Sequence, residues 1–288
     1  MRLSLRTTLT VALLAATACG GATAGAPGDD GTVDVVAAFY PLAWAAERVG
    51  GAEVDVTNLT PPGVEPHDLE LTSEALEAIA AADVVVTMGV GFQPAIDDAV
   101  AAEATGVVVT IPPAGDDPHI WLEPRRFVDA VEDVAAGLIE AGADPTPLEE
   151  GRAGLVEDLE QLDADLDAGL ADCDRRTLLV NHDAFGLLAA AYGLTQESIS
   201  GLSPEAEPDP ARIAALAELA RETASTTVFT EPLAPADVAD TLAAEAGLVT
   251  AVLDPVEGLD EERIVAGEDY LSVMRTNLET LRDGLGCR

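Results

Sequence analysis

The sequence predicts an α/β protein with two lobes, each built on a parallel β-sheet flanked by helices, and with one long rigid helix joining them. Three observations support this fold class. Short apolar runs alternate with helical stretches, and such alternation is typical of parallel βαβ units. A long acidic stretch with regularly spaced leucines separates one set of alternating runs from a second. At 288 residues, the chain is long enough for two lobes.

The first lobe is expected to occupy residues 32–144. Its strand-like runs are rich in valine, a β-branched residue that favours strands. These runs are Val33 to Phe39, Glu53 to Leu59, Val84 to Met88 and Val107 to Ile111. The expected helices are Leu42 to Val49, which stops at Gly50-Gly51, then Ser73 to Ala81, Pro94 to Ala104 and the amphipathic stretch Arg125 to Ala141.

The linking helix is expected within residues 145–172, over Thr146 to Asp172. Leucines recur there at helical spacing, at positions 148, 155, 159, 162, 166 and 170. Pro147 suits the first turn of a helix, where its missing N–H has no intrahelical partner in any case. Three glycines in this stretch lower its helix propensity, but the leucine spacing still favours one continuous helix.

The second lobe is expected to occupy residues 173–288, where the alternation restarts. Its expected strands are Thr177 to Val180, Thr227 to Thr230 and Leu248 to Leu253. Its expected helices are Ala184 to Tyr192, Pro210 to Thr223, Pro235 to Ala246 and a final helix, Glu262 to Leu285. A proline-rich loop is expected between the first two of these helices.

The chain is strongly acidic, with a formal net charge of −39, 14 arginines and no lysine. Such an anion repels nucleic acids and acidic lipid surfaces, so no nucleic-acid partner is expected, and it draws cations toward any cleft. An acidic surface is also a common adaptation to salt. The charge alone therefore supports no particular function.

The N-terminus resembles an export signal. Arg2 and Arg6 precede a mostly apolar run from Leu9 to Ala16, and the small residues Thr17 and Ala18 precede Cys19. This ending resembles a bacterial lipobox, although Ala16 stands where leucine is usual, and a signal cleaved elsewhere is the alternative. We therefore expect a signal peptide at 1–19, lipid on Cys19 and a flexible tether at 20–31. The mature protein is expected outside the cytoplasm, anchored to the membrane at the periplasmic side or the cell surface.

The remaining cysteines are an even pair. With Cys19 lipidated, Cys173 and Cys287 are left in an oxidising compartment. We predict a disulfide between them that ties the C-terminus to the start of the second lobe. Two buried free thiols are the alternative.

The three histidines of the chain all follow predicted strands. His67 follows the strand ending at Leu59, His119 the strand ending at Ile111, and His182 the strand ending at Val180. A fourth strand leads into Asp254-Pro255-Val256-Glu257. Ligands of open parallel sheets bind beyond the carboxyl ends of the strands, so we expect these loops to face one another between the lobes.

Three imidazoles and a carboxylate suit Zn²⁺ and similar divalent cations. A histidine placed alone would most often be structural or exposed, and the shared placement at strand ends is what favours a metal site. Asp68, Asp117 and Asp183 are candidates for orienting the imidazole rings through hydrogen bonds. The alternative is that these acids are ordinary solvated side chains.

Seven segments carry a resemblance to a known family. They are AAFYPLAWAAERVGG, TPPGVEPHDLELT, DPHIWLEP, NHDAFGLLAAAYGL, GLSPEAEPDPARI, VFTEP and LDPVEGL, from about residue 37 to about residue 259. The chain resembles the periplasmic metal-binding proteins of bacterial zinc and manganese ABC importers, the cluster A-I solute-binding proteins. The resemblance implies two α/β lobes joined by one rigid helix, a metal held between them, and a cognate ABC permease as partner.

The resemblance also implies a ligand set. His67, His119 and His182 match the three metal-ligand positions of the family. Glu257 matches a glutamate that reaches the metal in some zinc members. In other members the aspartate that matches Asp254 binds the metal, or water completes the shell. Of these, Glu257 is the expected fourth ligand.

The resemblance favours Zn²⁺ over Mn²⁺. Manganese-type members tend to carry glutamate where this chain has His182, and manganese prefers more oxygen ligands. Many zinc members, however, have a long loop rich in histidine and acids where this chain has only the short segment Pro112 to Pro118. A manganese or mixed-metal receptor therefore stays open as an alternative.

These features together favour a monomeric transport receptor, not an enzyme, that binds Zn²⁺ outside the membrane and delivers it to an ABC permease. A zinc-dependent hydrolase is the alternative of another class, because three histidines and an open position can activate water. The sequence contains no HExxH motif. Adhesion to host matrix, suggested by some relatives, is neither supported nor excluded by the sequence.

Overall fold

A computed structural model of the chain describes residues 31–288, except for residues 68, 90 and 203–208. The predicted signal peptide, Cys19 and the predicted tether up to residue 30 lie outside the described residues. Residues 32–288 form one unit, to which every element below belongs. Within the described part of the chain, no helix is both long enough and apolar enough to cross a bilayer.

Four parallel strands make the first sheet, as predicted. The strands are β1 (Val33–Ala37), β2 (Val54–Asn58), β3 (Val84–Thr87) and β4 (Val107–Thr110), in the order β2-β1-β3-β4. The helical elements of this part are α1 (Tyr40–Gly50), η1 (Gly51–Glu53), α2 (Ser73–Ala81), α3 (Pro94–Glu103), η2 (Ile120–Leu122) and α4 (Pro124–Glu140). Strand β3 is buried along its whole length, which explains its run of three valines.

A second parallel sheet also has four strands, one more than the sequence predicts. The strands are β5 (Thr177–Val180), β6 (Thr195–Ser198), β7 (Thr227–Thr230) and β8 (Val249–Val252), in the order β6-β5-β7-β8. The helices are α6 (Gly186–Ala191), α7 (Pro210–Glu222), α8 (Asp237–Ala246), α9 (Glu261–Val265) and α10 (Tyr270–Leu285). Strand β6 was missed because its sequence, Thr-Gln-Glu-Ser, has no apolar run. It lies at the sheet edge, where hydrogen bonds to β5 hold it and little of it is buried.

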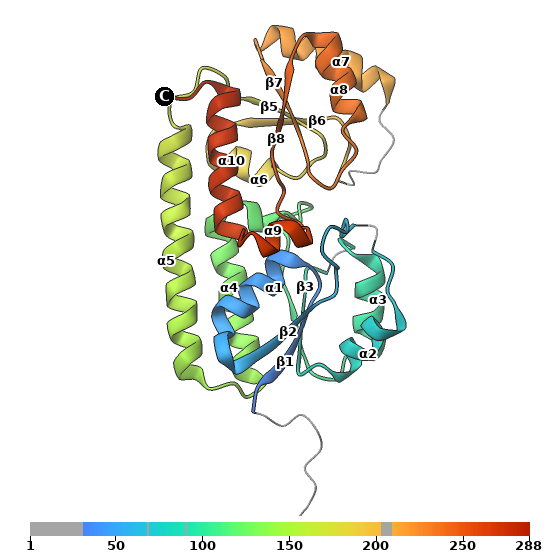
Figure 1. The fold of residues 1–288 in the computed structure, drawn as a ribbon, viewed down its shortest axis with the longest axis vertical. Coiled ribbons are helices and arrows are strands. Elements are labelled where there is room, and N and C mark those ends of the chain that lie inside the picture. Colours follow the sequence, from blue (N-terminus) through green and yellow to red (C-terminus); the bar gives the residue numbers. More distant parts are fainter. Residues whose placement is uncertain (1–30, 68, 90, 203–208) are drawn as a thin grey trace, which may run out of the picture. The chain divides into compact units, whose positions relative to one another are not determined.

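The predicted linking helix is present as α5 (Pro145–Leu170). Asp144 caps it, because its carboxylate accepts a hydrogen bond from the Thr146 N–H. The six predicted leucines are all fully buried, and α5 contacts α1, α4 and α10 (Figure 1). A Cβ at Gly151 would lie 2.4 Å from the Val49 carbonyl oxygen. This glycine therefore allows the end of α1 to approach α5 closely.

The predicted final helix, Glu262 to Leu285, is wrong as a single helix. It is divided into α9 and α10. Gly267, with φ 83°, adopts the left-handed conformation that commonly ends a helix. Asp269 then caps α10, since its carboxylate accepts from the Ser272 N–H and its own N–H donates to the Ser272 hydroxyl. These capping signals lie inside an otherwise helical sequence pattern.

The hydrophobic core joins the two sheets. One cluster of buried residues includes Val85 of β3 and Phe229 of β7. Aromatic rings pack within this cluster. The ring centroid of Trp44 in α1 lies 4.8 Å from that of Tyr270 in α10. The Tyr270 hydroxyl also donates a hydrogen bond to the Trp121 carbonyl oxygen. The lobes are therefore held by shared packing in addition to the linking helix.

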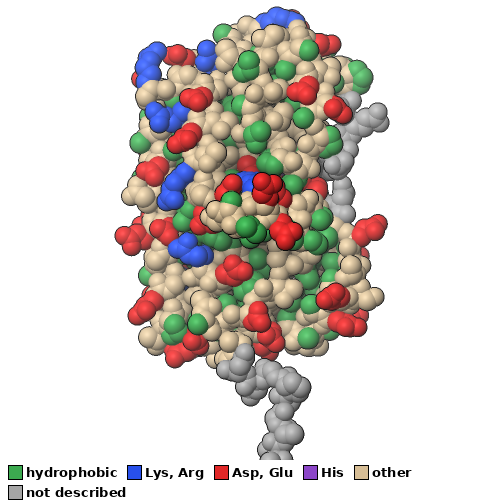
Figure 2. Space-filling view, viewed as in Figure 1, with side chains coloured by type: hydrophobic (Ala, Val, Ile, Leu, Met, Phe, Trp, Pro, Cys, Tyr) green, Lys and Arg blue, Asp and Glu red, His purple; other side chains and the backbone are tan. Residues whose placement is uncertain are grey.

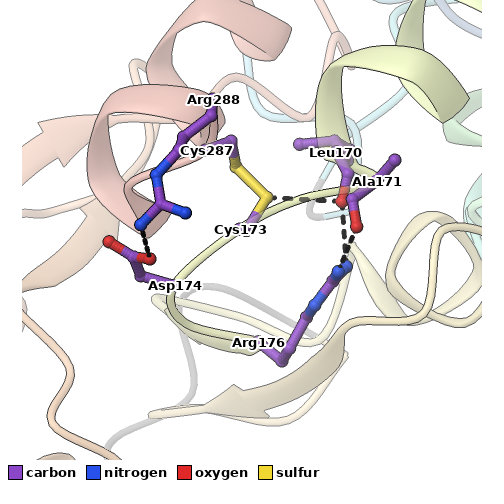
Figure 3. The surroundings of a disulfide bond; sticks show 7 residues. All are labelled: Leu170, Ala171, Cys173, Asp174, Arg176, Cys287 and Arg288. Carbon is purple, nitrogen blue, oxygen red and sulfur yellow. Dashed lines mark hydrogen bonds and ion pairs between the residues drawn. A yellow bond between two sulfur atoms is a disulfide. The ribbon is translucent and has the colours of Figure 1, made fainter.

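Cys173 and Cys287 form a disulfide, which confirms the prediction (Figure 3). Cys173 lies just after α5 and Cys287 just after α10, so the bond ties the C-terminal ends of these two helices. Two arginines add contacts nearby: Arg288 donates to Asp174 at 2.8 Å, and Arg176 donates to the Leu170 carbonyl oxygen at 2.8 Å.

Acidic side chains are spread over the surface. Figure 2 shows aspartate and glutamate at many points of the visible face, with arginine at fewer. Some arginines pair with acids, as Arg152 does with Glu149 and Glu132. Such exposed pairs are screened by salt and add little stability. On the visible face the acidic side chains are scattered and do not gather into a single patch.

Candidate metal centre

The four residues predicted from the sequence meet at one point of the structure. His67 follows β2, His119 follows β4, His182 follows β5 and Glu257 follows β8. Each therefore lies beyond the carboxyl end of a parallel strand, where the loops of α/β sheets converge. One nitrogen or oxygen atom from each side chain lies within 4.8 Å of the corresponding atoms of the other three.

Glu257 lies at the centre of this group. Its Oε1 is 3.4 Å from Nε2 of His67, 3.3 Å from Nε2 of His119 and 3.5 Å from Nε2 of His182. The side chains of His119 and His182 are fully buried, and that of Glu257 is 1% exposed. His67 is the most exposed of the four, at 9%. The group is therefore enclosed, with His67 nearest to solvent.

Asp117 orients His119. Its Oδ1 lies 2.9 Å from the backbone nitrogen of His119 and 2.9 Å from Nδ1 of the ring. An ionised carboxylate only accepts hydrogen bonds, so Nδ1 carries a proton and Nε2 is the nitrogen that faces Glu257. Asp117 is one of the three acids that the sequence offers for this role.

Glu231 orients His182 in the same way, and the sequence reasoning missed it. Its Oε2 lies 2.5 Å from Nδ1 of His182, and its Oε1 accepts from the His182 N–H at 3.1 Å. Glu231 directly follows β7, the neighbour of β5. Its position after a strand, in the segment VFTEP, was a usable signal. Asp183 instead accepts a hydrogen bond from Gln196, and Asp68 lies outside the described residues.

Glu65 and Phe92 flank His67. The Glu65 carboxylate accepts a hydrogen bond from the His67 N–H at 3.1 Å, and the Phe92 ring lies 4.5 Å from the imidazole. Burial, together with the nearby Glu257 carboxylate, raises the pKa of Glu65 to about 8. Glu65 therefore tends to be protonated at neutral pH and adds little charge to the site.

Asp254, the alternative fourth residue, is engaged elsewhere. Its Oδ1 accepts from the Val256 N–H at 2.7 Å, and its Oδ2 accepts from Arg263 at 2.7 Å. Its backbone N–H donates to Asn277 Oδ1 at 2.9 Å. Because both carboxylate oxygens are occupied, the geometry favours Glu257 over Asp254 as the acid that faces the imidazoles.

The site combines a charged carboxylate with imidazoles that retain protons. Burial raises the pKa of Glu257, but the three surrounding imidazoles outweigh it and hold that pKa well below its usual range. Burial lowers the pKa of His182, yet Glu231 and Glu257 together raise it to about 10. For His119, burial again lowers the pKa, but Asp117 and Glu257 outweigh this effect and raise it. A cation that binds these imidazoles would have to displace such protons.

The distances from Glu257 Oε1 fit three of the six edges of a tetrahedral metal site. Nε2 of each histidine and both carboxylate oxygens of Glu257 are buried without a hydrogen-bond partner among the described residues. Ligands about 2.0–2.1 Å from a tetrahedral Zn²⁺ lie about 3.3 Å from one another. The three distances from Glu257 Oε1 to the imidazole nitrogens, 3.3 to 3.5 Å, match this ligand-to-ligand distance. Unpaired buried polar atoms are costly, and one divalent cation would satisfy four of them.

Comparison with known proteins gives consistent matches. The family model described as zinc-uptake complex component A, periplasmic (ZnuA), matches residues 35–284. The zinc-binding protein AdcA of Streptococcus pyogenes is 34% identical over 288 residues, a match that covers 88% of this chain and 56% of AdcA. The chain thus spans about half the length of these AdcA relatives. The high-affinity zinc uptake system protein ZnuA of Bacillus subtilis is 30% identical, with 93% of each chain covered.

Solved structures agree with these sequence matches. The Zn(II)-bound ZnuA-like domain of Streptococcus pneumoniae AdcA is 35% identical, with a TM-score of 0.77 over 88% of this chain and 99% of that one. The metal-dependent lipoprotein YcdH of Bacillus subtilis is 32% identical, with a TM-score of 0.78. The match covers 88% of this chain and 100% of YcdH. The matched range includes both sheets apart from the first two residues of β1, together with the long helix and all four residues of the centre. On this evidence the chain belongs to the ZnuA family of periplasmic zinc-uptake components.

Proposed function

We propose that the chain is an extracytoplasmic receptor that binds Zn²⁺ through His67, His119, His182 and Glu257 and delivers it to an ABC permease. The observation that carries this proposal is the position of Glu257 Oε1, 3.3 to 3.5 Å from three imidazole Nε2 atoms. That spacing is the ligand-to-ligand distance of a tetrahedral zinc site. The family match and the zinc-binding names of the relatives support zinc as the cargo.

The donor set favours zinc over manganese. Three nitrogens and one carboxylate suit Zn²⁺, whereas Mn²⁺ prefers oxygen ligands and more of them. In the short segment 112–118, an antiparallel β-bridge between the backbones of Ala114 and Asp117 holds a tight turn. Asp117 is engaged with His119. Zinc capture by this chain therefore relies on the buried residues and not on a histidine-rich loop.

A binding role fits the site better than catalysis. A zinc hydrolase needs an open position where the metal activates water. In the proposed site Glu257 would take the fourth position, and its side chain is buried with those of His119 and His182. A closed shell of this kind holds a metal ion for transfer.

We propose a division of labour along the chain. Residues 32–144 and 173–288 act as the two lobes, and residues 145–172 form the helix between them. The N-terminal segment serves export, with lipid on Cys19 as the membrane anchor. Lipoprotein relatives support this assignment, among them the zinc-binding lipoprotein AdcA of Streptococcus pneumoniae. The receptor acts as a monomer that meets its permease at the membrane surface.

Metal content tests the proposal most directly. Protein purified without added metal is expected to contain up to about one zinc ion per chain, as a single four-ligand site requires. In isothermal titration with Zn²⁺ and Mn²⁺ in competition, zinc is expected to displace manganese. Tighter binding of manganese, or no binding of either ion, would contradict the proposal.

Zinc affinity is expected to fall as the pH falls. Histidine binds metal only through a neutral nitrogen, and the pKa of His182 is raised to about 10, with that of His119 raised as well. Zinc must therefore displace protons, and each displaced proton weakens binding by up to about tenfold per pH unit. Isothermal titration at about pH 5 and about pH 7.5 measures the change, with circular dichroism as a control for folding. Equal affinity at both values would exclude the three-histidine site.

A further inference from the structure

The backbone of Val256 adopts a conformation that valine rarely takes. Its φ is 56°, in the left-handed region, where a β-branched side chain is crowded against its own backbone. The residue is fully buried. Among the described residues, Ala224 is the only other non-glycine with positive φ. Backbone strain of this kind persists only where surrounding contacts impose it, and it concentrates at functional sites.

The strained residue separates two groups that must point in different directions. The carbonyl oxygen of Pro255 accepts a buried hydrogen bond from Trp121 Nε1 at 2.7 Å. Glu257, two residues later, reaches the imidazoles. The left-handed turn at Val256 lets the chain make both contacts within three residues. Without it, either the bond to Trp121 or the position of Glu257 would change.

Asp254 supplies the contact that holds this turn. Its Oδ1 accepts from the Val256 N–H at 2.7 Å. Asp254 is fixed in turn from two sides: Arg263 donates to its Oδ2 at 2.7 Å, and Asn277 bonds both its N–H and its carbonyl oxygen, at 2.9 and 2.7 Å. Through these hydrogen bonds, Asp254 connects α9 and α10 to the backbone immediately before Glu257.

We infer that Asp254 is a positioning residue, whose carboxylate holds Val256 in the left-handed conformation and thereby places Glu257 among the three imidazoles. The inference rests on the proposed function, because its main consequence is a change in zinc affinity. It assigns Asp254 a role through Glu257 and not as a ligand.

The surroundings of Asp254 make the inference testable by substitution. Asp254, Arg263 and Asn277 border a cavity of about 560 Å³ between α10 and the end of β8. If the carboxylate is removed, Arg263 keeps its bond to Glu268 and can reach this space. The Asp254→Ala variant is therefore expected to fold.

Glycine at position 256 should compensate for the loss of Asp254. Asp254→Ala is expected to weaken zinc binding by about 10- to 100-fold, the usual effect of removing a group that orients a ligand. Glycine adopts positive φ without steric cost, so the Asp254→Ala/Val256→Gly variant is expected to recover most of this loss. Asp254→Ala/Ala224→Gly is the matched control. Ala224 is the other residue with positive φ, 53°, so this variant removes backbone strain away from Glu257 and should not recover zinc affinity. Isothermal titration with Zn²⁺ measures all four proteins.

Two results of the zinc titrations would overturn the inference. One is unchanged zinc affinity in Asp254→Ala, and the other is a double variant at 254 and 256 that binds no better than Asp254→Ala, as expected if Asp254 were a ligand. Hydrogen exchange of the metal-free proteins separates this from a failure of the proposed function. Exchange at the amides of Val256 and Glu257 should quicken in Asp254→Ala whether or not zinc is the cargo, and unchanged exchange would also overturn the inference. A wild-type chain that binds no zinc would contradict the proposed function alone.

Discussion

Replacement of His182 by alanine is expected to weaken zinc binding by more than about 100-fold, beyond the 10- to 100-fold typical when a group that orients a ligand is lost. The variant leaves two imidazoles and one carboxylate in the shell. His182 is fully buried and its Nε2 lies 3.5 Å from Glu257 Oε1, so its replacement removes one of the three imidazole nitrogens around that oxygen. Competition with a chelator of known affinity measures the loss.

Two further variants calibrate this result. Glu231→Gln keeps the size of the side chain and an acceptor for the Nδ1 proton of His182 but removes the charge, so its loss should fall within about 10- to 100-fold. Asp183→Asn changes the adjacent acid, which bonds Gln196 and not an imidazole, and should bind zinc as the wild type does. If His182→Ala bound zinc as tightly as the wild type, the ligand assignment would be wrong.

Much of the fold could be predicted because burial leaves a periodic signal in the sequence. The three valines of β3 and the six buried leucines of α5 are such signals. Strand β6 gave none, because an edge strand can be held by backbone hydrogen bonds with polar side chains. The break between α9 and α10 was missed for a different reason. It depends on Gly267 and on the cap at Asp269, which are local features within a continuous helical pattern.

The candidate site also has residues that could be predicted from the sequence and contacts that could not. The histidines and Glu257 could be found because each follows a strand, and the carboxyl ends of parallel strands converge. Glu231 also follows a strand, but its pairing with His182 could not be predicted, because that contact depends on the order of β5 and β7 in the sheet. The roles of Asp254 and Glu257 likewise depend on the positive φ of Val256. No residue-type pattern reveals a left-handed valine.

Removal of the disulfide is expected to lower the free energy of unfolding by about 2–4 kcal/mol. Cys173 and Cys287 are 114 residues apart in sequence, so the bond closes a loop that contains nearly all of the second lobe. A cross-link of this span restricts the unfolded chain more than the folded one, in which the ends of α5 and α10 already lie together. The Cys173→Ser/Cys287→Ser variant avoids a lone reactive thiol. Urea unfolding followed by circular dichroism measures the change.

The same experiment contains its own control. The slope of the free energy against urea concentration should rise in the variant, because an unfolded chain without the cross-link exposes more surface. A reducing agent should lower the stability of the wild type to that of the variant and leave the variant unchanged. If reduction had no effect on the wild type, the arginine contacts of the same region would suffice to hold it. Arg288 with Asp174 would then account for the joining of the two helix ends.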